Sequence, residues 1–447
     1  MNRDFEHLLN FDLTVKSLGK PTYDSPLKLS EMHGDSVVNY VSENERILTI
    51  NTPVQLEYCI NNKINIPSFE KAGPRSKLFF KPGDTVSAIV TCGGLCPGLN
   101  DVIRALVIMN YHRYGNRIIY GIRYGYEGFI DEYKHEIVNL TPRTVRDINK
   151  IGGTILGSSR GPQDVGRIVD KLVELNVNVL YTIGGDGTLR GALDITNEIK
   201  KRNLKISIIG IPKTIDNDIS YINKSFGTET AFSKACDSIF SAHTEARGSY
   251  NGIGLVKVMG RHSGFIAANA TLATNDVNFV LIPEVSFDLH GELGFLNCLK
   301  KRLEANKHAV ILVAEGAGQD LVENQDVKYD ASGNKKLFDI GLFLQEQIKK
   351  YFNEENVPVT IKYIDPSYII RSTSTTPNDS IFCFQLAQRA VHAGMSGKTG
   401  IVVGYFRNEF VHIPIEIATS KRQTIDPESE LWLSVLETTG QSIKFKN

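Results

Sequence analysis

The sequence predicts a doubly wound α/β fold preceded by an N-terminal extension. Nine short apolar runs rich in β-branched residues follow one another between Val86 and Gly404. They are continuous rather than alternating, which is typical of strands buried on both faces of a parallel sheet. Amphipathic stretches separate them, and such strand–helix alternation indicates helices on both faces of the sheet. Residues 1 to about 80 show no clean period and form the predicted extension.

The apolar runs and the amphipathic stretches give the expected elements. The predicted strands are 86–90, 117–122, 178–183, 205–211, 252–259, 279–282, 308–314, 359–364 and 400–404. The helical candidates include 100–114, 187–202, 227–243, 263–274 and 378–395. Ligands of such sheets bind in the loops beyond the carboxyl ends of the strands. Functional residues are therefore expected directly after the strands.

The charge balance and hydropathy narrow the class of protein. The 447 residues contain 50 Lys+Arg and 50 Asp+Glu, a formal net charge of zero. A nucleic-acid binder usually shows a strong basic excess, so we expect no nucleic-acid partner. No stretch approaches the ~20 apolar residues that a membrane span needs, and the N-terminus lacks the apolar core of a signal peptide. We expect a soluble, cytoplasmic protein that binds anions through local cations and backbone amides.

The first predicted strand ends in a glycine-rich turn, TCGGLCPGLN at 91–100, before a helix begins. Glycines such as Gly93 let backbone N–H groups approach a phosphate, and the helix N-terminus adds a positive dipole. A plain tight turn is the competing interpretation. The spacing matches neither G-x-G-x-x-G nor the Walker A loop.

The segment IGGDGTLRG at 183–191 follows the third predicted strand. Its glycines clear the space around one acid, Asp186. A carboxylate facing a polyphosphate is repulsive unless a divalent cation lies between them, and Mg²⁺ takes one or two protein carboxylates plus phosphate oxygens and water. The alternative is a glycine turn in which Asp186 only caps a helix.

A third loop, IPKTIDND at 211–218, places two acids, a hydroxyl and a lysine at another strand end. Lys213 can neutralise a phosphate, Thr214 can hold one, and Asp216 or Asp218 can accept a hydroxyl proton or join a metal shell. A solvated Asx-rich turn is the alternative for this loop alone. Three such loops after three strands favour a phosphate site.

Further polar residues follow other strands or lie in small-residue loops. Arg160 lies in GGTILGSSRG at 152–161, and arginine suits the charge on a transferred phosphoryl group. Arg261 lies in VMGRHSGF at 258–265, Glu315 in AEG at 314–316 and Arg371 in DPSYIIR at 365–371. Each of these could instead be an ordinary loop or core residue.

The segments GGDGT, PKTIDND and MGRHSGF, in this order, resemble the phosphofructokinase family from about Val86 to about Gly404. GGDGT alone also resembles NAD kinases and diacylglycerol kinases. The resemblance implies two doubly wound, Rossmann-like domains facing each other across a cleft. The implied organisation is a 1–80 extension, an 81–227 nucleotide domain completed by about 372–430, and a 228–371 sugar-phosphate domain to which the C-terminal tail returns.

The resemblance implies an ATP-dependent 6-phosphofructokinase, which moves the γ-phosphoryl of ATP to the 1-hydroxyl of fructose 6-phosphate, the committed step of glycolysis. Asp216 matches the catalytic base, which is ionised at neutral pH. Thr214 and Arg160 match transition-state contacts, and Asp186 the Mg²⁺ ligand. The implied ATP site is lined by Gly93, Tyr126, Arg160, Gly185, Asp186, Gly187, Thr188 and Gly191. The implied sugar-phosphate site comprises Lys213, Thr214, Asp216, Asp218, Met259, Gly260, Arg261, Glu315, Lys362, Tyr368 and Arg371.

Departures from the short ATP-using relatives bear on the phosphoryl donor. Lys213 is typical of the pyrophosphate-using branch, but that branch usually has an acid in place of Gly187. The combination resembles longer ATP-using members nested within the pyrophosphate-like branch, so ATP is expected. The alternatives are a pyrophosphate-dependent phosphofructokinase, a lipid or NAD-type kinase sharing only GGDGT, and a catalytically silent regulatory subunit.

The resemblance also implies a homodimer or homotetramer, because in the family a neighbouring subunit lends part of the sugar-phosphate site. The short relatives lend an Arg where this chain has Gly252, and Lys362 replaces a second Arg. Tyr368 replaces a His.

Overall fold

The computed structural model describes residues 3–322 and 337–447. The chain forms two compact units and passes between them more than once. Unit 1 comprises Met1–Thr214, Ile219–Phe226 and Ser374–Arg422, and unit 2 comprises Ile215–Asp218, Gly227–Thr373 and Gln423–Asn447.

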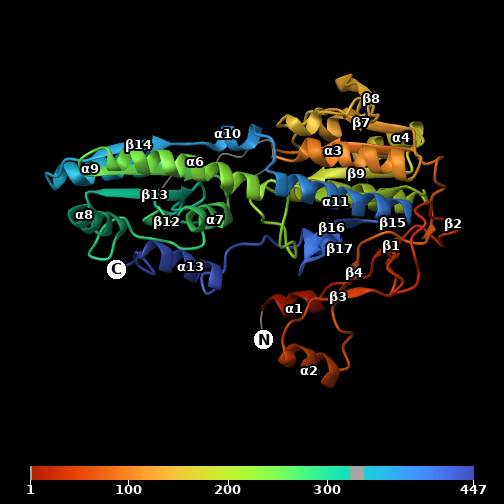
Figure 1. The fold of residues 1–447 in the computed structure, drawn as a ribbon, viewed down its shortest axis with the longest axis horizontal. Coiled ribbons are helices and arrows are strands. Elements are labelled where there is room, and N and C mark those ends of the chain that lie inside the picture. Colours follow the sequence, from red (N-terminus) through yellow and green to blue (C-terminus); the bar gives the residue numbers. More distant parts are fainter. Residues whose placement is uncertain (1–2, 323–336) are drawn as a thin grey trace. The chain divides into compact units, whose positions relative to one another are not determined.

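Unit 1 is built on a nine-stranded sheet with the order β3-β4-β17-β16-β10-β9-β6-β7-β8 (Figure 1). Its five central strands are parallel, as predicted for strands buried on both faces. These strands are β6 (Ser87–Thr91), β7 (Ile119–Ile122), β9 (Val179–Gly184), β10 (Ser207–Pro212) and β16 (Ile401–Phe406). The antiparallel strands are β3 (Arg46–Leu48), β4 (Ser68–Lys71), β8 (Ile137–Asn139) and β17 (Glu409–Pro414).

Helices cover both faces of this sheet. A Cβ on Gly394 of α11 (Pro377–Met395) would lie 2.6 Å from Val179 of β9, so α11 packs on the face of the odd-numbered β9 residues. Leu180 lies on the opposite face, in the core that also contains Leu189 and Ala192 of α5 (Asp186–Lys201). The other helices of unit 1 are α1 (Arg3–Leu9), α2 (Pro53–Asn61), α3 (Leu99–Ile108), α4 (Val165–Glu174) and α12 (Ile415–Ala418). The doubly wound arrangement is confirmed.

The N-terminal extension joins unit 1 through backbone pairing. β3 pairs with β4, and β4 pairs with β17 at the sheet edge. Two short ladders also form, between β1 (Lys16–Ser17) and β15 (Lys398–Thr399) and between β2 (Tyr23–Asp24) and β5 (Lys77–Leu78). The extension therefore adds strands to the sheet instead of forming a separate domain.

Unit 2 contains a four-stranded parallel sheet with the order β12-β13-β11-β14. The strands are β11 (Gly252–Val258), β12 (Phe279–Leu281), β13 (His308–Ala314) and β14 (Thr360–Ile364). The helices are α6 (Thr228–Arg247), α7 (Phe265–Thr274), α8 (Phe295–Asn306), α9 (Ile340–Glu354), α10 (Ser367–Ser372) and α13 (Glu430–Thr439). All nine predicted strands are thus present in the two sheets.

Close packing against α6 explains the two glycines of β11. A Cβ on Gly254 would lie 2.6 Å from the Ala242 carbonyl oxygen, and one on Gly252 would overlap that of Ala246. On the other face, Ile253 and Leu255 lie in a core with residues of α8 and α9. The strand therefore lies within van der Waals contact of the α6 backbone, and no side chain fits at position 252.

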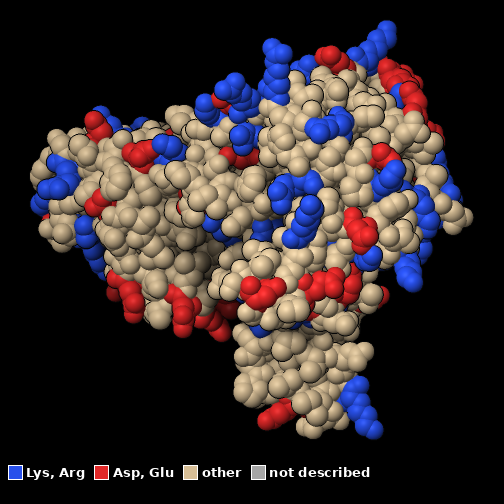
Figure 2. All heavy atoms as spheres, turned by 45° about the vertical axis from the view of Figure 1, so that its right-hand side comes forward, with Lys and Arg blue, Asp and Glu red and all other residues tan. Residues whose placement is uncertain are grey.

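The charged surface is mixed, as the composition predicts. On the face drawn in Figure 2, basic and acidic side chains are both present over the surface. Among the helices of the described residues, none has the length and hydropathy required to cross a membrane.

Candidate active site

The loop between β9 and α5 places Asp186 in the first turn of a helix. Gly185 is the N-cap residue, and Asp186 begins α5. A Cβ on Gly184 would overlap the Thr188 side chain, so this glycine is required by packing. At Gly187, by contrast, a Cβ would meet no atom within 4 Å. The start of α5 therefore presents one carboxylate next to open space.

Asp186 forms an ion pair that the sequence analysis did not consider. Arg190 Nη2 lies 3.0 Å from Asp186 Oδ2, one helical turn further on. The i, i+4 spacing was the available signal, since residues four apart are neighbours on a helix surface. The α5 N-terminus favours negative charge at the same position. A cation that binds here together with an anionic ligand would compete with Arg190 for the Asp186 carboxylate.

Tyr126 packs against the first turns of α5. Its hydroxyl donates a hydrogen bond of 2.8 Å to the Thr188 carbonyl. A Cβ on Gly191 would lie 2.8 Å from the Tyr126 ring, so Gly191 permits this contact. Burial raises the pKa of Tyr126 well above its ordinary value, which keeps the hydroxyl protonated as a donor. Tyr126 thus fixes the loop in place.

Two cations meet the glycine turn after β6. Lys213 Nζ donates 2.9 Å to the Gly94 carbonyl, and it would lie 3.6 Å from a Cβ on Gly93. Arg160 Nη2 would lie 3.3 Å from a Cβ on Gly94. Gly93 has a φ of +85°, a conformation that favours glycine. The Gly93 N–H donates 3.0 Å to the Ser159 carbonyl. The turn therefore lies beside the Lys213 and Arg160 charges, which come from two distant segments of the sequence.

The end of β10 holds Lys213 and Thr214 in unit 1. The Lys213 N–H donates 3.0 Å to the Gly184 carbonyl, which continues the β9–β10 ladder. Thr214 is buried, and its carbonyl accepts a hydrogen bond from the Ser225 hydroxyl. The chain enters unit 2 at the next residue.

Asp216 and Asp218 lie in a segment of unit 2 that is fixed through its main chain. The Ser263 hydroxyl donates 2.8 Å to the Asp216 carbonyl, and the Gln423 N–H donates 2.8 Å to the Asp218 carbonyl. Asn217 between them has a φ of +53°. The structure thus brings Asp216 next to the turn that contains Arg261.

The turn after β11 has an unusual backbone. Gly260 has a φ of +138° and Arg261 a φ of +33°, which a non-glycine residue rarely adopts. A Cβ on Gly316 would overlap the Arg261 carbonyl, so the loop after β13 touches this turn directly. The Arg261 N–H donates 3.2 Å to Glu315 Oε1. Met259 is buried beside them. Four of the predicted sugar-phosphate residues (Met259, Gly260, Arg261 and Glu315) therefore form one cluster.

The remaining predicted sugar-phosphate residues lie on β14 and α10. Lys362 is on the edge strand of the sheet, where its side chain is 47% exposed and lies 3.6 Å from Glu245 of α6. Tyr368 is 82% exposed. Arg371 lies in the last turn of α10.

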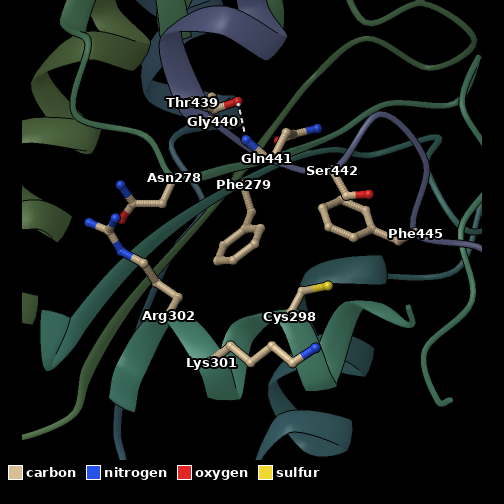
Figure 3. Close-up of a pocket in the computed structure, with 10 residues that line it drawn as sticks. All are labelled: Asn278, Phe279, Cys298, Lys301, Arg302, Thr439, Gly440, Gln441, Ser442 and Phe445. Atoms are coloured by element: carbon tan, nitrogen blue, oxygen red, sulfur yellow. Dashed lines mark hydrogen bonds between the residues drawn. The ribbon is translucent and has the colours of Figure 1, made fainter. Parts of the chain in front are cut away.

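A cavity of about 240 Å³ in unit 2 lies elsewhere (Figure 3). It is lined by residues at the start of β12, on α8 and in the C-terminal tail, among them Asn278, Arg302 and Gln441. Gln441 bonds through its side chain to both backbone groups of Val280 on β12. None of the predicted site residues lines this cavity.

The functional loops of both units follow the carboxyl ends of parallel strands and carry glycine turns, cations and single carboxylates. This combination defines the class: an α/β phosphotransferase, which positions phosphates and stabilises their charge. The family model described as phosphofructokinase matches residues 86–394. The chain belongs to the phosphofructokinase family.

Relatives agree with this assignment, and a solved structure has a similar fold. The chain is 48% identical to the ATP-dependent 6-phosphofructokinase of Borreliella burgdorferi, over 98% of each chain. It is 46% identical to that of Amycolatopsis methanolica, over 97% of this chain and 96% of the relative. The fold is similar to a pyrophosphate-dependent phosphofructokinase from Marinobacter aquaeolei, with a TM-score of 0.65, 16% identity, and coverage of 80% of this chain and 92% of that chain.

Proposed function

We propose that the chain is an ATP-dependent 6-phosphofructokinase, which phosphorylates the 1-hydroxyl of fructose 6-phosphate. The observation that carries the choice of donor is the open space at Gly187, directly beside Asp186. ATP has an α-phosphate and a nucleoside that pyrophosphate lacks, and both need room beyond the two phosphates that transfer requires. The curated relatives above are also named ATP-dependent.

The residues of unit 1 support a site for the Mg²⁺ form of ATP. Within residues 3–322 and 337–447, no group of three or more His, Cys, Asp or Glu gathers to hold a metal. Asp186 supplies a single carboxylate, which suits Mg²⁺ because this ion takes one or two protein carboxylates and fills its shell with phosphate oxygens and water. When bound, Mg²⁺ would neutralise phosphate charge. Lys213 and Arg160 at the Gly93–Gly94 turn would stabilise charge on the transferred group.

The residues of unit 2 support a role in binding and activating the sugar phosphate. Asp216 would accept the proton of the 1-hydroxyl as it attacks the phosphoryl group. Arg261 and Arg371 would pair with the 6-phosphate, and Glu315 with sugar hydroxyls. The Ser263 bond to the Asp216 backbone fixes the base relative to the Arg261 turn, which is the positioning that phosphoryl transfer requires.

The rival with specific support is a pyrophosphate-dependent enzyme, because Lys213 adds a second cation beside Arg160 at the Gly93–Gly94 turn, and a second cation could replace contacts to a nucleotide. The test measures initial rates of fructose 6-phosphate phosphorylation with Mg²⁺ and either ATP or pyrophosphate. We expect turnover with ATP and little with pyrophosphate. Equal or faster turnover with pyrophosphate would refute the donor assignment, and no turnover with either would indicate a catalytically silent subunit.

A further inference from the structure

Lys257 is a cation on a buried strand, one residue before the strand ends. It lies on β11, which pairs on one side with β13 and on the other with β14. Only 8% of the residue is exposed. Burying an ammonium group is costly unless it is paired and hydrogen-bonded. A lysine at this position therefore needs specific partners.

Two carboxylates from separate segments are the partners of Lys257. Lys257 Nζ lies 2.6 Å from Asp339 Oδ2 and 2.9 Å from Asp365 Oδ2. Burial by itself lowers the Lys257 pKa, but the hydrogen bonds to both carboxylates outweigh it and raise the pKa above its ordinary value. Burial raises the pKa of each carboxyl group, and Lys257 lowers both below their usual range. The lysine therefore stays protonated and both acids stay ionised.

Asp365 connects this centre to α10. It accepts bonds from the Ser367 N–H at 3.0 Å and from the Ser367 hydroxyl at 2.5 Å. Ser367 is the first residue of α10, which also carries Tyr368 in its first turn and Arg371 in its last turn. The direction in which α10 leaves the sheet is thus set by a carboxylate that Lys257 holds.

Asp339 connects the centre to α9 and to β14. It caps α9 by accepting 3.1 Å from the Leu342 N–H, and it accepts 3.2 Å from the Tyr363 hydroxyl. The Tyr363 ring packs on the first turn of α9, where a Cβ on Gly341 would lie 2.5 Å from it. This contact fixes Asp339 against the strand that leads into Asp365.

A second link reaches the Glu315 turn. Gln319 donates 3.0 Å to the Glu315 carbonyl and 3.3 Å to the Phe338 carbonyl, and it accepts 3.2 Å from the Phe338 N–H. Phe338 directly precedes Asp339. Lys257 itself lies two residues before Met259 on the strand that leads into the Arg261 turn. Three segments assigned to the sugar phosphate, namely the Arg261 turn, the Glu315 turn and α10, therefore converge on one buried cation.

We propose that Lys257 is a positioning residue for the sugar-phosphate half of the active site. It touches no substrate; it acts by holding Asp365 and Asp339, and through them α10 and the Glu315 turn. The proposal rests on the proposed function, because that function assigns these segments to fructose 6-phosphate.

The test compares Lys257→Met with a matched control, Lys398→Met. Lys398 in unit 1 is buried to a similar extent and is also held by two carboxylates, Glu43 at 2.5 Å and Glu70 at 3.2 Å. We expect Lys257→Met to raise the KM for fructose 6-phosphate roughly 10- to 100-fold, while the KM for ATP changes by less than about twofold. Lys398→Met loses stability but should leave both KM values near those of the wild type.

Asp365→Asn gives an independent readout if Lys257→Met does not fold. It should raise the KM for fructose 6-phosphate. Where Lys257→Met does fold, the double variant should raise this KM no more than the single variant with the larger effect, because the two residues act as one unit. A folded Asp365→Asn variant with an unchanged KM for fructose 6-phosphate would refute the proposal. So would a Lys257→Met variant that behaves like the control.

Calorimetric titration of fructose 6-phosphate separates this result from a failure of the proposed function. A wild-type chain that binds the sugar phosphate without turnover would refute the function, and the variants would still test positioning through Kd. A wild-type chain that neither binds nor reacts would refute both.

Discussion

Gly184, Gly187 and Gly191 lie in one nine-residue segment, yet the structure explains the absence of a side chain differently at each position. A side chain at Gly184 would overlap Thr188, and one at Gly191 would meet the Tyr126 ring, whereas one at Gly187 would meet nothing within 4 Å. Packing therefore explains two of these glycines, and a ligand would explain the third. The sequence predicted the loop and its acid, but it could not separate these roles, because each depends on a neighbour distant in the chain.

The open space at Gly187 makes a test of the donor possible. We expect Gly187→Asp to fold and to raise the KM for ATP roughly 10- to 100-fold, because the new carboxylate takes the room of the α-phosphate and repels its charge. Steady-state kinetics with varied ATP measure the effect. Gly187→Ala is the matched control for size without charge and should raise the KM much less. An unchanged KM for ATP in a folded Gly187→Asp variant would show that this loop does not lie next to the α-phosphate of bound ATP.

Replacement of the proposed base gives a second prediction at this scale. Asp216→Ser should lower kcat by about 10²–10⁴-fold, the usual contribution of a positioned base, with a much smaller change in the KM for fructose 6-phosphate. The Ser263 bond is to the Asp216 backbone, so the loop should keep its shape in this variant. Survival of kcat with a raised KM would instead make Asp216 a binding group and place the base elsewhere.

At the scale of elements, the nine strands of the parallel ladders were predictable, and the antiparallel strands β3, β4, β8 and β17 of unit 1 were not. Continuous apolar runs identified β6, β9, β10, β11 and β13, because burial on both faces leaves a local signature. β4 pairs with β17, a partner more than 300 residues away in the sequence, and its four residues Ser68–Lys71 include Glu70 and Lys71. Lys257 was not singled out from the sequence because it lies within an apolar run and its partners are contributed by other elements.

Strand β4, which lies between β3 and β17, is held by a buried ionic cluster centred on Glu70. The Glu70 carboxylate lies 2.9 Å from Arg75 Nη2, 3.2 Å from Lys398 Nζ and 2.9 Å from His412 Nδ1. Burial raises the Glu70 pKa, but these partners, His412 first, lower it to about 2. Burial is the main cause that lowers the pKa of His412, so the neutral imidazole donates from Nδ1. The N-terminal extension is thus fastened to the sheet by charge as well as by backbone pairing.

We expect Glu70→Gln to lower the free energy of unfolding by about 3 kcal/mol at neutral pH, since it removes the buried carboxylate and leaves Arg75 and Lys398 paired with Glu43 only. Because folding lowers the Glu70 pKa from 4.5 to about 2, its contribution is complete above about pH 4.5 and is lost as the pH falls toward 2. The difference between wild type and variant should therefore shrink with acidification.

Urea unfolding followed by circular dichroism, at about pH 7 and about pH 3.5, measures this difference. The exposed pair Lys81–Asp84 provides the control; Asp84→Asn should change the midpoint little at either pH. A Glu70→Gln deficit that is equal at both pH values would mean that packing rather than charge accounts for the loss.

At the scale of the whole molecule, the chain is expected to need a second copy. Position 252 cannot carry the arginine that short relatives lend to a neighbour, because its Cβ would overlap the α6 backbone. The other position at which the resemblance implies a lent residue is Lys362, on the exposed edge strand β14. A phosphate monoester with about two negative charges still requires cationic partners, so we expect Lys362 to reach the sugar phosphate of another subunit.

We therefore predict a homodimer or homotetramer with shared sites, and activity from mixtures of two weak variants. Asp216→Ser lacks the base and Lys362→Ala lacks the lent cation, so each alone should have low activity. In a mixed dimer, one of the two sites combines an intact Asp216 from one subunit with an intact Lys362 from the other. Activity should therefore recover to about half of the wild-type value in a purely mixed dimer, and to about a quarter after random exchange of equal amounts. Sedimentation measures the assembly, and differently tagged chains confirm that subunits exchange.

Two Lys362→Ala preparations mixed together serve as the control and should gain no activity. If exchange is demonstrated and activity still does not recover, each chain builds its own sugar-phosphate site and Lys362 acts within its own subunit.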